Sequence, residues 1–327
     1  MDAVSESKRI LIVTPAPPGS LKGNRVTAMR WARLLRKSSY QVRVDEQYDH
    51  QDCDLMIALH ARRSAKSIQQ FRQANPNKPL IVGLVGTDVY HDIHSNRLAQ
   101  QSLELATGFI VLQPEATKEV PKRLRSKVRV VYQSVKVPAR KPPKLTSVFE
   151  VCVLGHLRPV KDPFRTAMAS RQLPADSKIQ IVHLGAALSE SMEKRARQEM
   201  RRNPRYTWLG EFPKWKAMQR LARSRLLVVS SRMEGGANVV SEAAALRVPV
   251  LASHISGSIG LLGHEYPGYF PVGDTNALAS LLLRVESERT FAKELLSFGD
   301  QLGKLTTERS EQSRLAELVD ETTGGAN

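Results

Sequence analysis

Short apolar runs alternate with helix-length segments along most of this 327-residue chain. The runs are rich in Val, Ile and Leu, which is typical of parallel strands that are buried on both faces. In the first half of the chain they cover residues 10–13, 42–44, 55–59, 80–85, 108–112 and 128–131. Strands that alternate with helices predict an α/β fold built on a doubly wound parallel sheet.

A segment rich in proline and basic residues interrupts this pattern. Residues 136–147 contain three prolines and four basic residues but few apolar ones, which is typical of a linker. The pattern then restarts, with apolar runs at 149–154, 179–184, 206–209, 226–229 and 249–252. We therefore predict two Rossmann-like domains whose parallel sheets face each other across a ligand cleft. The predicted parts are a first domain over 1–137, a linker over 138–147, a second domain over 148–300, and a C-terminal helix and tail over 301–327.

The charge of the chain narrows the class of ligand. Lys and Arg total 49 and Asp and Glu total 32, so the net charge is +17, and residues 1–150 hold 25 basic and 13 acidic side chains. The first half therefore carries +12, which attracts anions such as nucleotide phosphates, acidic lipid headgroups or nucleic acid. A nucleic-acid-binding protein would show a concentrated basic stripe or a known module. Neither is present, so we predict no nucleic-acid partner.

Several features predict a cytoplasmic protein without stable membrane association. No apolar stretch reaches the roughly 18 residues that a membrane span needs. The polar start of the chain lacks the apolar core of a secretory signal. Cys53 and Cys152 are the only cysteines, and their spacing fits neither a zinc site nor a disulfide framework, which suits a reducing compartment.

The most specific segment of the second half covers residues 230–243. A predicted strand ends just before it, two glycines follow Glu234, and a helix is predicted from Asn238. Glycines let the backbone approach a ligand closely, and the start of a helix offers free N–H groups to a diphosphate. Glu234 and Glu242 have seven residues between them; Glu234 would face the ligand, and Glu242 could accept hydrogen bonds from ribose hydroxyls. The alternative is a plain glycine turn between two unrelated glutamates.

A second segment, residues 151–162, has a related layout. A predicted strand is followed by a glycine turn and then by two cations three residues apart, Arg158 and Lys161. Such a pair at the end of a parallel strand can hold a diphosphate and stabilise the negative charge of a departing nucleotide.

Together these segments resemble the nucleotide-sugar half of retaining glycosyltransferases with the two-Rossmann GT-B architecture. In that family a G-R-L-x-x-x-K turn and a Glu-x7-Glu motif bind the sugar nucleotide. The resemblance implies that Lys161 binds phosphate, that Glu234 contacts the sugar and that Glu242 binds the ribose. The chain departs at one position, where His156 replaces the family's arginine, and Arg158 is the other candidate for that phosphate contact. The implied sets are catalytic Glu234, Lys161 and Arg158, and UDP-sugar-binding Glu242, Gly235, Gly236, Asn238, Val239 and His156.

Five blocks of sequence make this resemblance more specific. They are similar to the selenosugar synthases, the glycosyltransferases of selenoneine biosynthesis, over nearly the whole chain. The resemblance implies transfer of a sugar from a UDP-sugar, with UDP-N-acetylglucosamine as the expected donor, to selenophosphate. It also implies a product with a carbon–selenium bond, and pathway partners that supply selenophosphate and use the selenosugar. The blocks are residues 23–32, 58–65, 86–90, 155–163 and 232–242.

A selenophosphate acceptor is a small polyanion, so its pocket needs cations and backbone donors. The first half offers such residues directly after three predicted strands, whose carboxyl ends meet at one edge of a parallel sheet. The expected acceptor-binding residues are Asn24, Arg25, His60, Arg62, Thr87 and Asp88, with Lys22 and Arg63 beside them. The alternatives are a solvated helix start for Arg62 and Arg63, and a helix N-cap for Asp88.

The sequence predicts no metal site and no cofactor. No Asp-x-Asp pair lies in the predicted diphosphate segments, and no G-x-G-x-x-G opens either half. Two other function classes stay open. A GT-B glycosyltransferase with another small or lipid acceptor would need an apolar or amphipathic basic helix in the first half, and Pro121 interrupts the basic region 118–129. A nucleotide-sugar sensor would keep the second-half motifs and need no acceptor cations.

Overall fold

The computed structural model describes residues 7–20, 23–140 and 142–324. The chain divides into two compact units, Met1–Ser134 with Thr307–Asn327, and Val135–Thr306. The described residues of the predicted linker contain no helix or strand and lie in the second unit. The predicted C-terminal part is shared between the units, because one helix ends at Leu305 and the last helix belongs to the first unit.

Six parallel strands form the sheet of the first unit, in the order β2-β1-β3-β4-β5-β6. Each strand coincides with one of the six apolar runs in the first half of the sequence. β1 lies between β2 and β3, so the strand order reverses there, which is where open α/β sheets bind ligands. The strands are β1 (Arg9–Val13), β2 (Gln41–Asp45), β3 (Leu55–Leu59), β4 (Leu80–Leu84), β5 (Gly108–Val111) and β6 (Val128–Val130).

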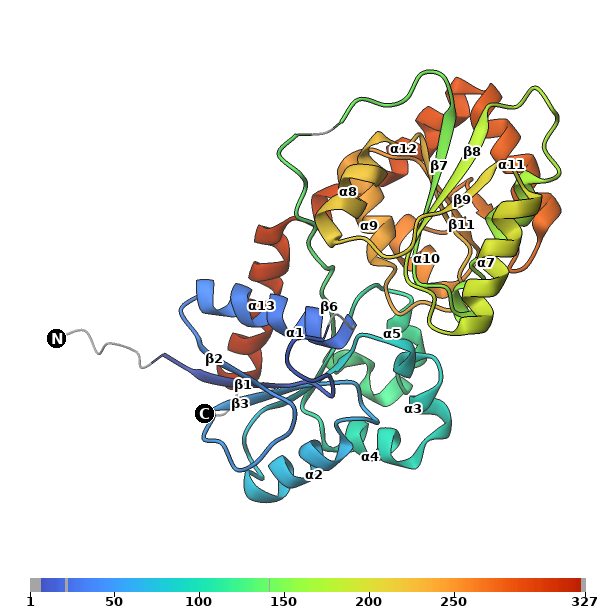
Figure 1. Ribbon diagram of the computed structural model, residues 1–327. Coiled ribbons are helices and arrows are strands. Elements are labelled where there is room, and N and C mark those ends of the chain that lie inside the picture. Colours follow the sequence, from blue (N-terminus) through green and yellow to red (C-terminus); the bar gives the residue numbers. More distant parts are fainter. Residues whose placement is uncertain (1–6, 21–22, 141, 325–327) are drawn as a thin grey trace. The chain divides into compact units, whose positions relative to one another are not determined.

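Helices cover both faces of this sheet (Figure 1). α1 and α13 lie on one face, where Trp31, Ile57 and Leu315 share a buried core. α2 and α4 lie on the other face, where Phe71 and Phe109 are fully buried. The helices of the unit are α1 (Gly23–Lys37), α2 (Ala65–Ala74), α3 (Asp92–Ser95), α4 (Arg97–Leu105), α5 (Ala116–Glu119) and α13 (Glu308–Gly324), with 3-10 turns η1 (Thr87–Val89) and η2 (Lys122–Lys127).

Buried polar contacts hold the last helix in the first unit. Glu311 of α13 is 0% exposed. Its Oε1 accepts a hydrogen bond from the Trp31 indole N–H at 3.0 Å, and its Oε2 accepts one from the Ser134 backbone N–H at 2.7 Å. A buried carboxylate without such partners would be costly, so these two bonds tie α13 to α1 and to the end of the segment after β6.

The second unit also has a six-stranded parallel sheet, in the order β12-β11-β10-β7-β8-β9. Five strands coincide with the predicted apolar runs. The sixth, β12, has only two residues and is too short to be recognised by its pattern. The strands are β7 (Phe149–Leu154), β8 (Ile179–Leu184), β9 (Tyr206–Trp208), β10 (Leu226–Val229), β11 (Val250–Ser253) and β12 (Tyr269–Phe270). The fold class is therefore α/β with two parallel Rossmann-like sheets, as the alternating pattern predicts.

Helices again lie on both sides of the sheet. Figure 1 shows α8, α9 and α12 on one side of β7 and β8, and α7 and α11 on the other. β10 and β7 are neighbours, so the loops that follow them meet at one edge of the sheet. The helices are α6 (Arg165–Ser170), α7 (Glu190–Arg202), α8 (Lys214–Arg223), α9 (Asn238–Leu246), α10 (Ser256–Leu262), α11 (Thr275–Ser287) and α12 (Arg289–Leu305), with the 3-10 turn η3 (Pro159–Lys161).

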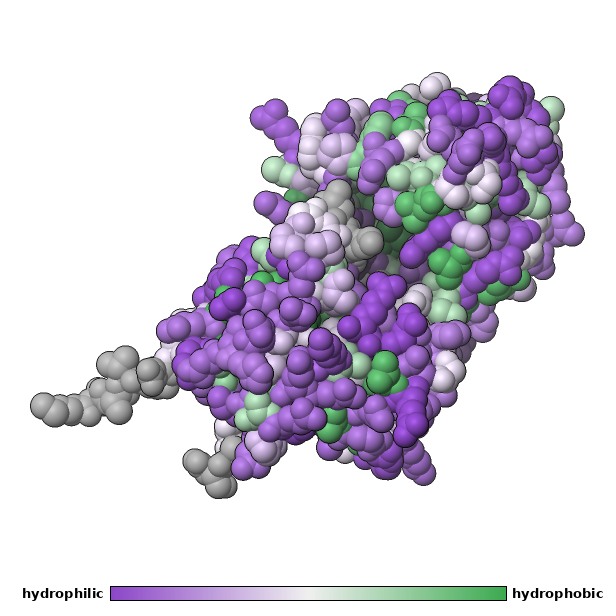
Figure 2. Space-filling view, turned by 60° about the horizontal axis from the view of Figure 1, so that its bottom comes forward, coloured by the Kyte–Doolittle hydropathy of each residue, from purple (hydrophilic) through white to green (hydrophobic). Residues whose placement is uncertain are grey.

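The described helices include none that is both long enough and apolar enough to span a membrane. Figure 2 shows a surface on which hydrophilic residues predominate and hydrophobic ones form small, separate patches. Two of the exposed apolar residues, Val26 and Met29, lie one turn apart on α1 and are 41% and 44% exposed. Their exposure bears on the kind of molecule that could bind to this helix.

Candidate functional site

The loop after β7 and the loop after β10 are tied together by backbone and hydroxyl contacts. The Ser230 hydroxyl donates to the carbonyl oxygens of Lys161 (3.2 Å) and Asp162 (2.9 Å). The Arg232 N–H donates to the Val160 carbonyl at 2.8 Å. Asp162 adopts a left-handed conformation, with φ of 43°, and ends the η3 turn that carries Lys161. These contacts fix the start of the Lys161 side chain beside the glycine loop of the Glu234 segment.

Lys161 and Glu234, both predicted as catalytic, form an ion pair. Glu234 is 9% exposed, and its Oε1 also accepts a hydrogen bond from the Ser231 hydroxyl at 2.6 Å. Both side chains line a small cavity together with Gly155 and Val239. A lysine that neutralises a carboxylate here can exchange this partner for an incoming phosphate, which would leave the carboxylate free for sugar hydroxyls.

Glu242, predicted to bind ribose, lies on α9 and is buried. It forms an ion pair with Lys214, the first residue of α8. Its second carboxylate oxygen, Oε2, is buried and has no hydrogen-bond partner among the described residues. An unpaired buried acceptor costs about 1–3 kcal/mol, and a hydroxyl donor would remove that cost. Lys214 is not predictable from the sequence, because nothing in its spacing connects it to Glu242.

The predicted glycine loop leads into the start of α9. Gly235 and Gly236 lie in the loop, Asn238 is the first helical residue, and Val239 reaches the small cavity. Among the residues that the structure describes, no side chain caps the start of α9. Uncapped N–H groups and the positive end of the helix dipole can bind an anion, provided that one reaches this position.

His156 and Arg158 remain alternative candidates for the second phosphate contact. Both are exposed and flank Leu157, which is fully buried. His156 Nδ1 accepts a hydrogen bond from the Ala186 N–H at 3.0 Å. The neutral imidazole therefore carries its proton on Nε2, which makes His156 a possible donor to a phosphate oxygen.

In the first unit, three predicted acceptor residues lie together, with one additional carboxylate. His60 follows β3, is 6% exposed and has a left-handed backbone with φ of 75°, a strained conformation for this residue. Its Nδ1 lies 3.8 Å from Asp88 Oδ2 and its Nε2 lies 3.8 Å from Asp92 Oδ2. Arg62 Nε donates to Asp92 Oδ2 at 3.0 Å. Asp92 was missed by the sequence analysis because it opens a four-residue helix and reads as an N-terminal acid.

Burial dominates the electrostatics of this His60 cluster. Asp88 is 0% exposed, and its carboxylate accepts hydrogen bonds from the backbone N–H groups of Ala61 (3.2 Å) and Gly86 (3.0 Å). Burial raises the pKa of Asp88 and lowers the pKa of His60, while the attraction between the two groups acts in the opposite direction on each. Within the described part of the chain, no three His, Cys, Asp or Glu side chains are grouped so as to hold a metal ion.

The other predicted acceptor residues lie at the start of α1 and at the start of η1. Asn24 and Arg25 lie in the first turn of α1, and Arg25 Nη1 is buried without a hydrogen-bond partner there. Thr87 begins η1, directly before Asp88. Lys22 lies outside the described residues. The structure thus brings together the loops after β3 and β4, and the convergence of the loop after β1 stays a prediction.

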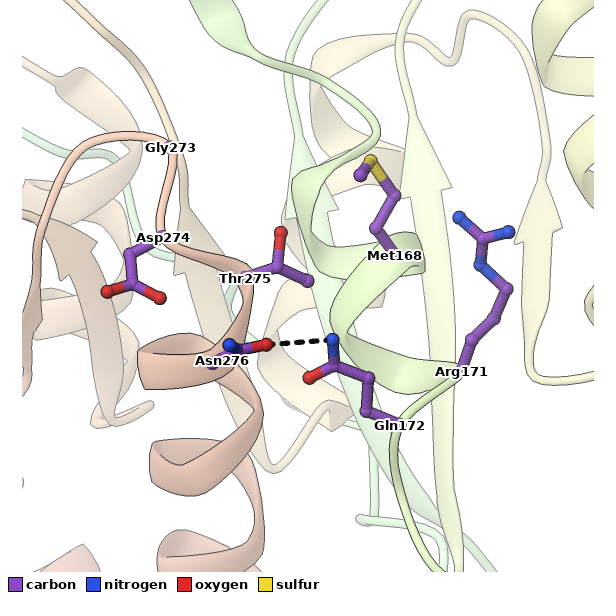
Figure 3. Close-up of a pocket in the computed structure, with 7 residues that line it drawn as sticks. All are labelled: Met168, Arg171, Gln172, Gly273, Asp274, Thr275 and Asn276. Carbon is purple, nitrogen blue, oxygen red and sulfur yellow. Dashed lines mark hydrogen bonds between the residues drawn. The ribbon is translucent and has the colours of Figure 1, made fainter.

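A larger hollow of about 550 Å³ lies elsewhere in the second unit, between the end of α6 and the start of α11 (Figure 3). Its polar side chains pair with one another, since the Gln172 amide donates to Asn276 Oδ1 at 2.9 Å. Asp274 accepts a hydrogen bond from the Ala277 N–H at 2.9 Å and so caps α11. None of the predicted site residues lines this hollow, so we assign the candidate site to the smaller cavity.

Most of the second unit matches a known protein family. Residues 139–300 match the model of the family described as "Glycosyl transferases group 1". This part of the chain is therefore similar to the group 1 glycosyltransferases.

Solved structures of similar fold extend over nearly the whole chain. HepE from Anabaena, solved with UDP-glucose, is 17% identical with a TM-score of 0.73, covering 96% of this chain and 100% of that one. Sucrose-phosphate synthase from Thermosynechococcus elongatus is 16% identical with a TM-score of 0.77, covering 98% and 100%. A glycosyltransferase from Rickettsia africae is 12% identical with a TM-score of 0.74, covering 97% and 99%. The fold is GT-B.

Proposed function

We propose that this protein is a glycosyltransferase that transfers a sugar from a UDP-sugar, with UDP-N-acetylglucosamine as the expected donor, to selenophosphate. One observation carries the donor part of the proposal. Glu234 and Glu242 lie on either side of the uncapped start of α9, and each buried carboxylate is held by a lysine. That arrangement supplies cations and N–H groups for a diphosphate and carboxylates for sugar and ribose hydroxyls. The UDP-glucose in the HepE structure supports the same class of donor.

The proposed reaction is a substitution at the anomeric carbon. The bond from this carbon to the β-phosphate oxygen breaks, and its electron pair leaves with UDP. A lone pair of selenium in selenophosphate forms the new carbon–selenium bond, so that the products are UDP and a selenium-linked sugar that carries the phosphoryl group. Lys161, assisted by Arg158 or His156, stabilises the charge that builds on the β-phosphate, where fixed cations are most effective.

The acceptor part rests on the selenosugar synthase resemblance and on the cations of the first unit. Arg62 and His60 follow β3 at the edge of the sheet where ligands bind in α/β folds, and Arg25 has a buried N–H group without a partner among the described residues. Asp88 and Asp92 would repel a polyanion, and burial lowers the pKa of His60, so we expect Arg62 and Arg25 to supply the positive charge for selenophosphate. We place the enzyme in the cytoplasm, between partners that supply selenophosphate and partners that use the selenosugar.

Mass spectrometry of the products tests this proposal directly. UDP-N-acetylglucosamine is incubated with selenophosphate, thiophosphate or phosphate, under anaerobic conditions so that selenium is not oxidised. We expect a sugar–selenium product, a weaker signal with thiophosphate, and UDP release only with an acceptor present. UDP release without any selenium-linked sugar would reject the acceptor. Absence of UDP binding to the wild-type protein would reject the donor as well.

A second acceptor class is favoured by one feature of the first unit. Val26 and Met29 are exposed one turn apart on α1, next to Arg25 and Arg30, and such a face suits the surface of an anionic membrane. A glycosyltransferase with a lipid acceptor would then bind there. Flotation with phosphatidylglycerol vesicles tests this alternative, which predicts co-migration that is lost in Met29→Glu and lowered by salt.

A further inference from the structure

A buried histidine lies directly behind the predicted phosphate loop. His183 of β8 is 1% exposed and lines the same small cavity as Lys161 and Glu234. It is buried in the sheet, so its polar atoms need partners inside the unit. The proposed reaction does not use His183.

Both ring nitrogens of His183 are engaged, and their partners fix the position of the proton. Nε2 lies 3.0 Å from the Gly155 carbonyl oxygen, and Nδ1 lies 3.0 Å from the Tyr206 hydroxyl. A carbonyl oxygen can only accept, so Nε2 carries the proton and donates to Gly155. Nδ1 is then the acceptor, and Tyr206 donates to it. Burial lowers the pKa of His183 to about 4, so the ring is neutral at pH 7 and is not a phosphate-binding cation.

The segment that follows His183 lies along the phosphate loop. The Gly155 N–H donates to the Leu184 carbonyl at 2.9 Å, and the Leu157 N–H donates to the Ala186 carbonyl at 2.8 Å. Gly185 has φ of 152°, and a Cβ at this position would lie only 2.0 Å from the Gly155 oxygen. The parallel pairing of β7 and β8 therefore continues past the strands and determines the path of the loop that leads to Lys161.

We propose that His183 and Tyr206 are positioning residues that hold the Gly155 carbonyl and thereby aim the 156–161 loop at the diphosphate. The inference rests on the proposed function only for the identity of the ligand. An apolar side chain in place of His183 would leave the Gly155 carbonyl unpaired, and the turn would move to find another donor. Tyr206 acts one step further away, because its hydroxyl holds the proton of His183 on Nε2.

Three variants separate positioning from general stability. His183→Leu removes the donor, His183→Gln keeps an N–H group that can reach the Gly155 oxygen, and Tyr206→Phe removes the hydroxyl. Val182→Ala is the matched control, because Val182 is also buried, is the preceding residue of β8 and does not line the cavity. Calorimetry with UDP and with inorganic pyrophosphate measures binding, and thermal melting measures stability.

We expect His183→Leu to weaken UDP and pyrophosphate binding at least tenfold and to lower kcat. His183→Gln should bind within about threefold of wild type, and Tyr206→Phe should weaken binding by a few-fold. Val182→Ala should lower the melting temperature but leave binding within about twofold. If His183→Leu binds UDP and pyrophosphate as well as Val182→Ala does, the inference is overturned. It is also overturned if His183→Gln has the melting temperature of wild type but does not restore binding.

A ligand-free measurement separates this inference from the proposed function. The backbone amide NMR signals of residues 156–161 report the loop directly; we expect them to shift in His183→Leu and to return in His183→Gln. If wild type binds neither UDP nor pyrophosphate while these shifts occur, the proposed donor is wrong and the positioning role stands. If the signals of His183→Leu match those of wild type, the positioning role is wrong whatever the protein binds.

Discussion

The two units share one architecture and differ in how their candidate sites are built. Both have six parallel strands with helices on both faces. In the second unit, each of the two candidate carboxylates, Glu234 and Glu242, is paired with a lysine, and the family match of residues 139–300 lies within this unit. In the first unit, His60 lies between two carboxylates, although residues 1–150 of the sequence carry +12 of the +17 net charge. Most of the positive charge of the first half is therefore not at its buried polar cluster.

This difference indicates which part of the reaction each unit would determine. A diphosphate and a ribose are common to all UDP-sugars, so a site for them can be assembled from motifs that many glycosyltransferases share. The acceptor differs from enzyme to enzyme, and the His60 cluster has the features of a specific site: a strained backbone, a fully buried carboxylate and a histidine whose charge depends on its surroundings. Variants in the two units should therefore separate donor from acceptor effects.

The largest effect is expected at Lys161 in the second unit. Lys161→Ala should lower turnover by about 10²–10³-fold, because a fixed cation at the β-phosphate acts mainly in the transition state. UDP affinity should fall much less. Steady-state rates and UDP calorimetry measure the two effects. Lys194→Ala, which removes an exposed lysine from an ion pair on α7, is the control and should change neither.

Arg158→Ala and His156→Ala, measured beside Lys161→Ala, decide which residue assists Lys161. If Arg158 has taken over from the family's arginine, Arg158→Ala is the damaging change. If only His156→Ala is damaging, His156 makes the phosphate contact. Its Nε2–H is available to donate, because the Ala186 N–H donates to the other ring nitrogen, Nδ1. A Lys161→Ala enzyme of near wild-type rate would remove the proposed charge stabilisation altogether.

The next effect concerns the ribose contact of Glu242. Glu242→Ala should weaken UDP and UDP-sugar alike by about 1.5–3 kcal/mol, the usual worth of a hydrogen bond to a charged group. The equal loss follows because both ligands contain the ribose. Calorimetry with UDP, UDP-sugar and 2′,3′-dideoxy-UDP measures it, and the dideoxy ligand should bind the variant and wild type similarly. Equal UDP binding by the variant and wild type would reject the ribose assignment.

Much of the fold is predictable because it depends on local pattern. Eleven of the twelve strands coincide with apolar runs, and β12 is missed because two residues have no readable period. The unit to which α13 belongs is not predictable, since Leu315 and Leu318 would suit any amphipathic helix. Its place depends on Trp31, nearly 300 residues earlier, which donates to Glu311.

The candidate site is predictable only where its residues belong to a motif. Lys161 and Glu234 are found from their spacing relative to glycines, and the structure pairs them. Lys214 and Asp92 are missed, because the fold brings each of them to its ion-pair partner and no fixed spacing in the sequence connects the two. His183 cannot be singled out in the sequence of its strand, and only its contact with Gly155 indicates a role.

The two buried histidines predict a difference in acid sensitivity between the units. The pKa of His183 falls from 6.5 to about 4 through burial, so the unfolded chain binds more protons between these two values. Stability of the second unit should therefore fall as pH falls, by about 2 kcal/mol between pH 7 and pH 5. His60 should contribute less, because Asp88 and Asp92 favour its protonated form and oppose the effect of burial.

Urea unfolding at pH 7 and pH 5 measures this effect. His183→Gln should lose less stability than wild type on acidification, whatever its stability at pH 7, because the variant has no titrating group at this position. An unchanged acid sensitivity in His183→Gln would show that other groups cause it. His60→Gln, compared in the same way, should differ from wild type by a smaller amount.

The smallest effect is expected in the first unit, at Arg62. The Arg62 side chain is 43% exposed and is paired with Asp92, so solvent screens its interaction with an anionic acceptor. Arg62→Ala should lower turnover about tenfold, or about 1.4 kcal/mol, mainly by raising the KM for selenophosphate. Arg25→Ala should act in the same direction if the loop after β1 joins this site. UDP affinity should stay at the wild-type value in both variants, because the donor contacts lie in the second unit. Arg97→Ala, on the same unit at the start of α4, is the control.

If the protein is a nucleotide-sugar sensor, Arg25→Ala and Arg62→Ala should leave its function unchanged. Loss of UDP binding in Arg62→Ala would instead mean that the first unit also binds the donor.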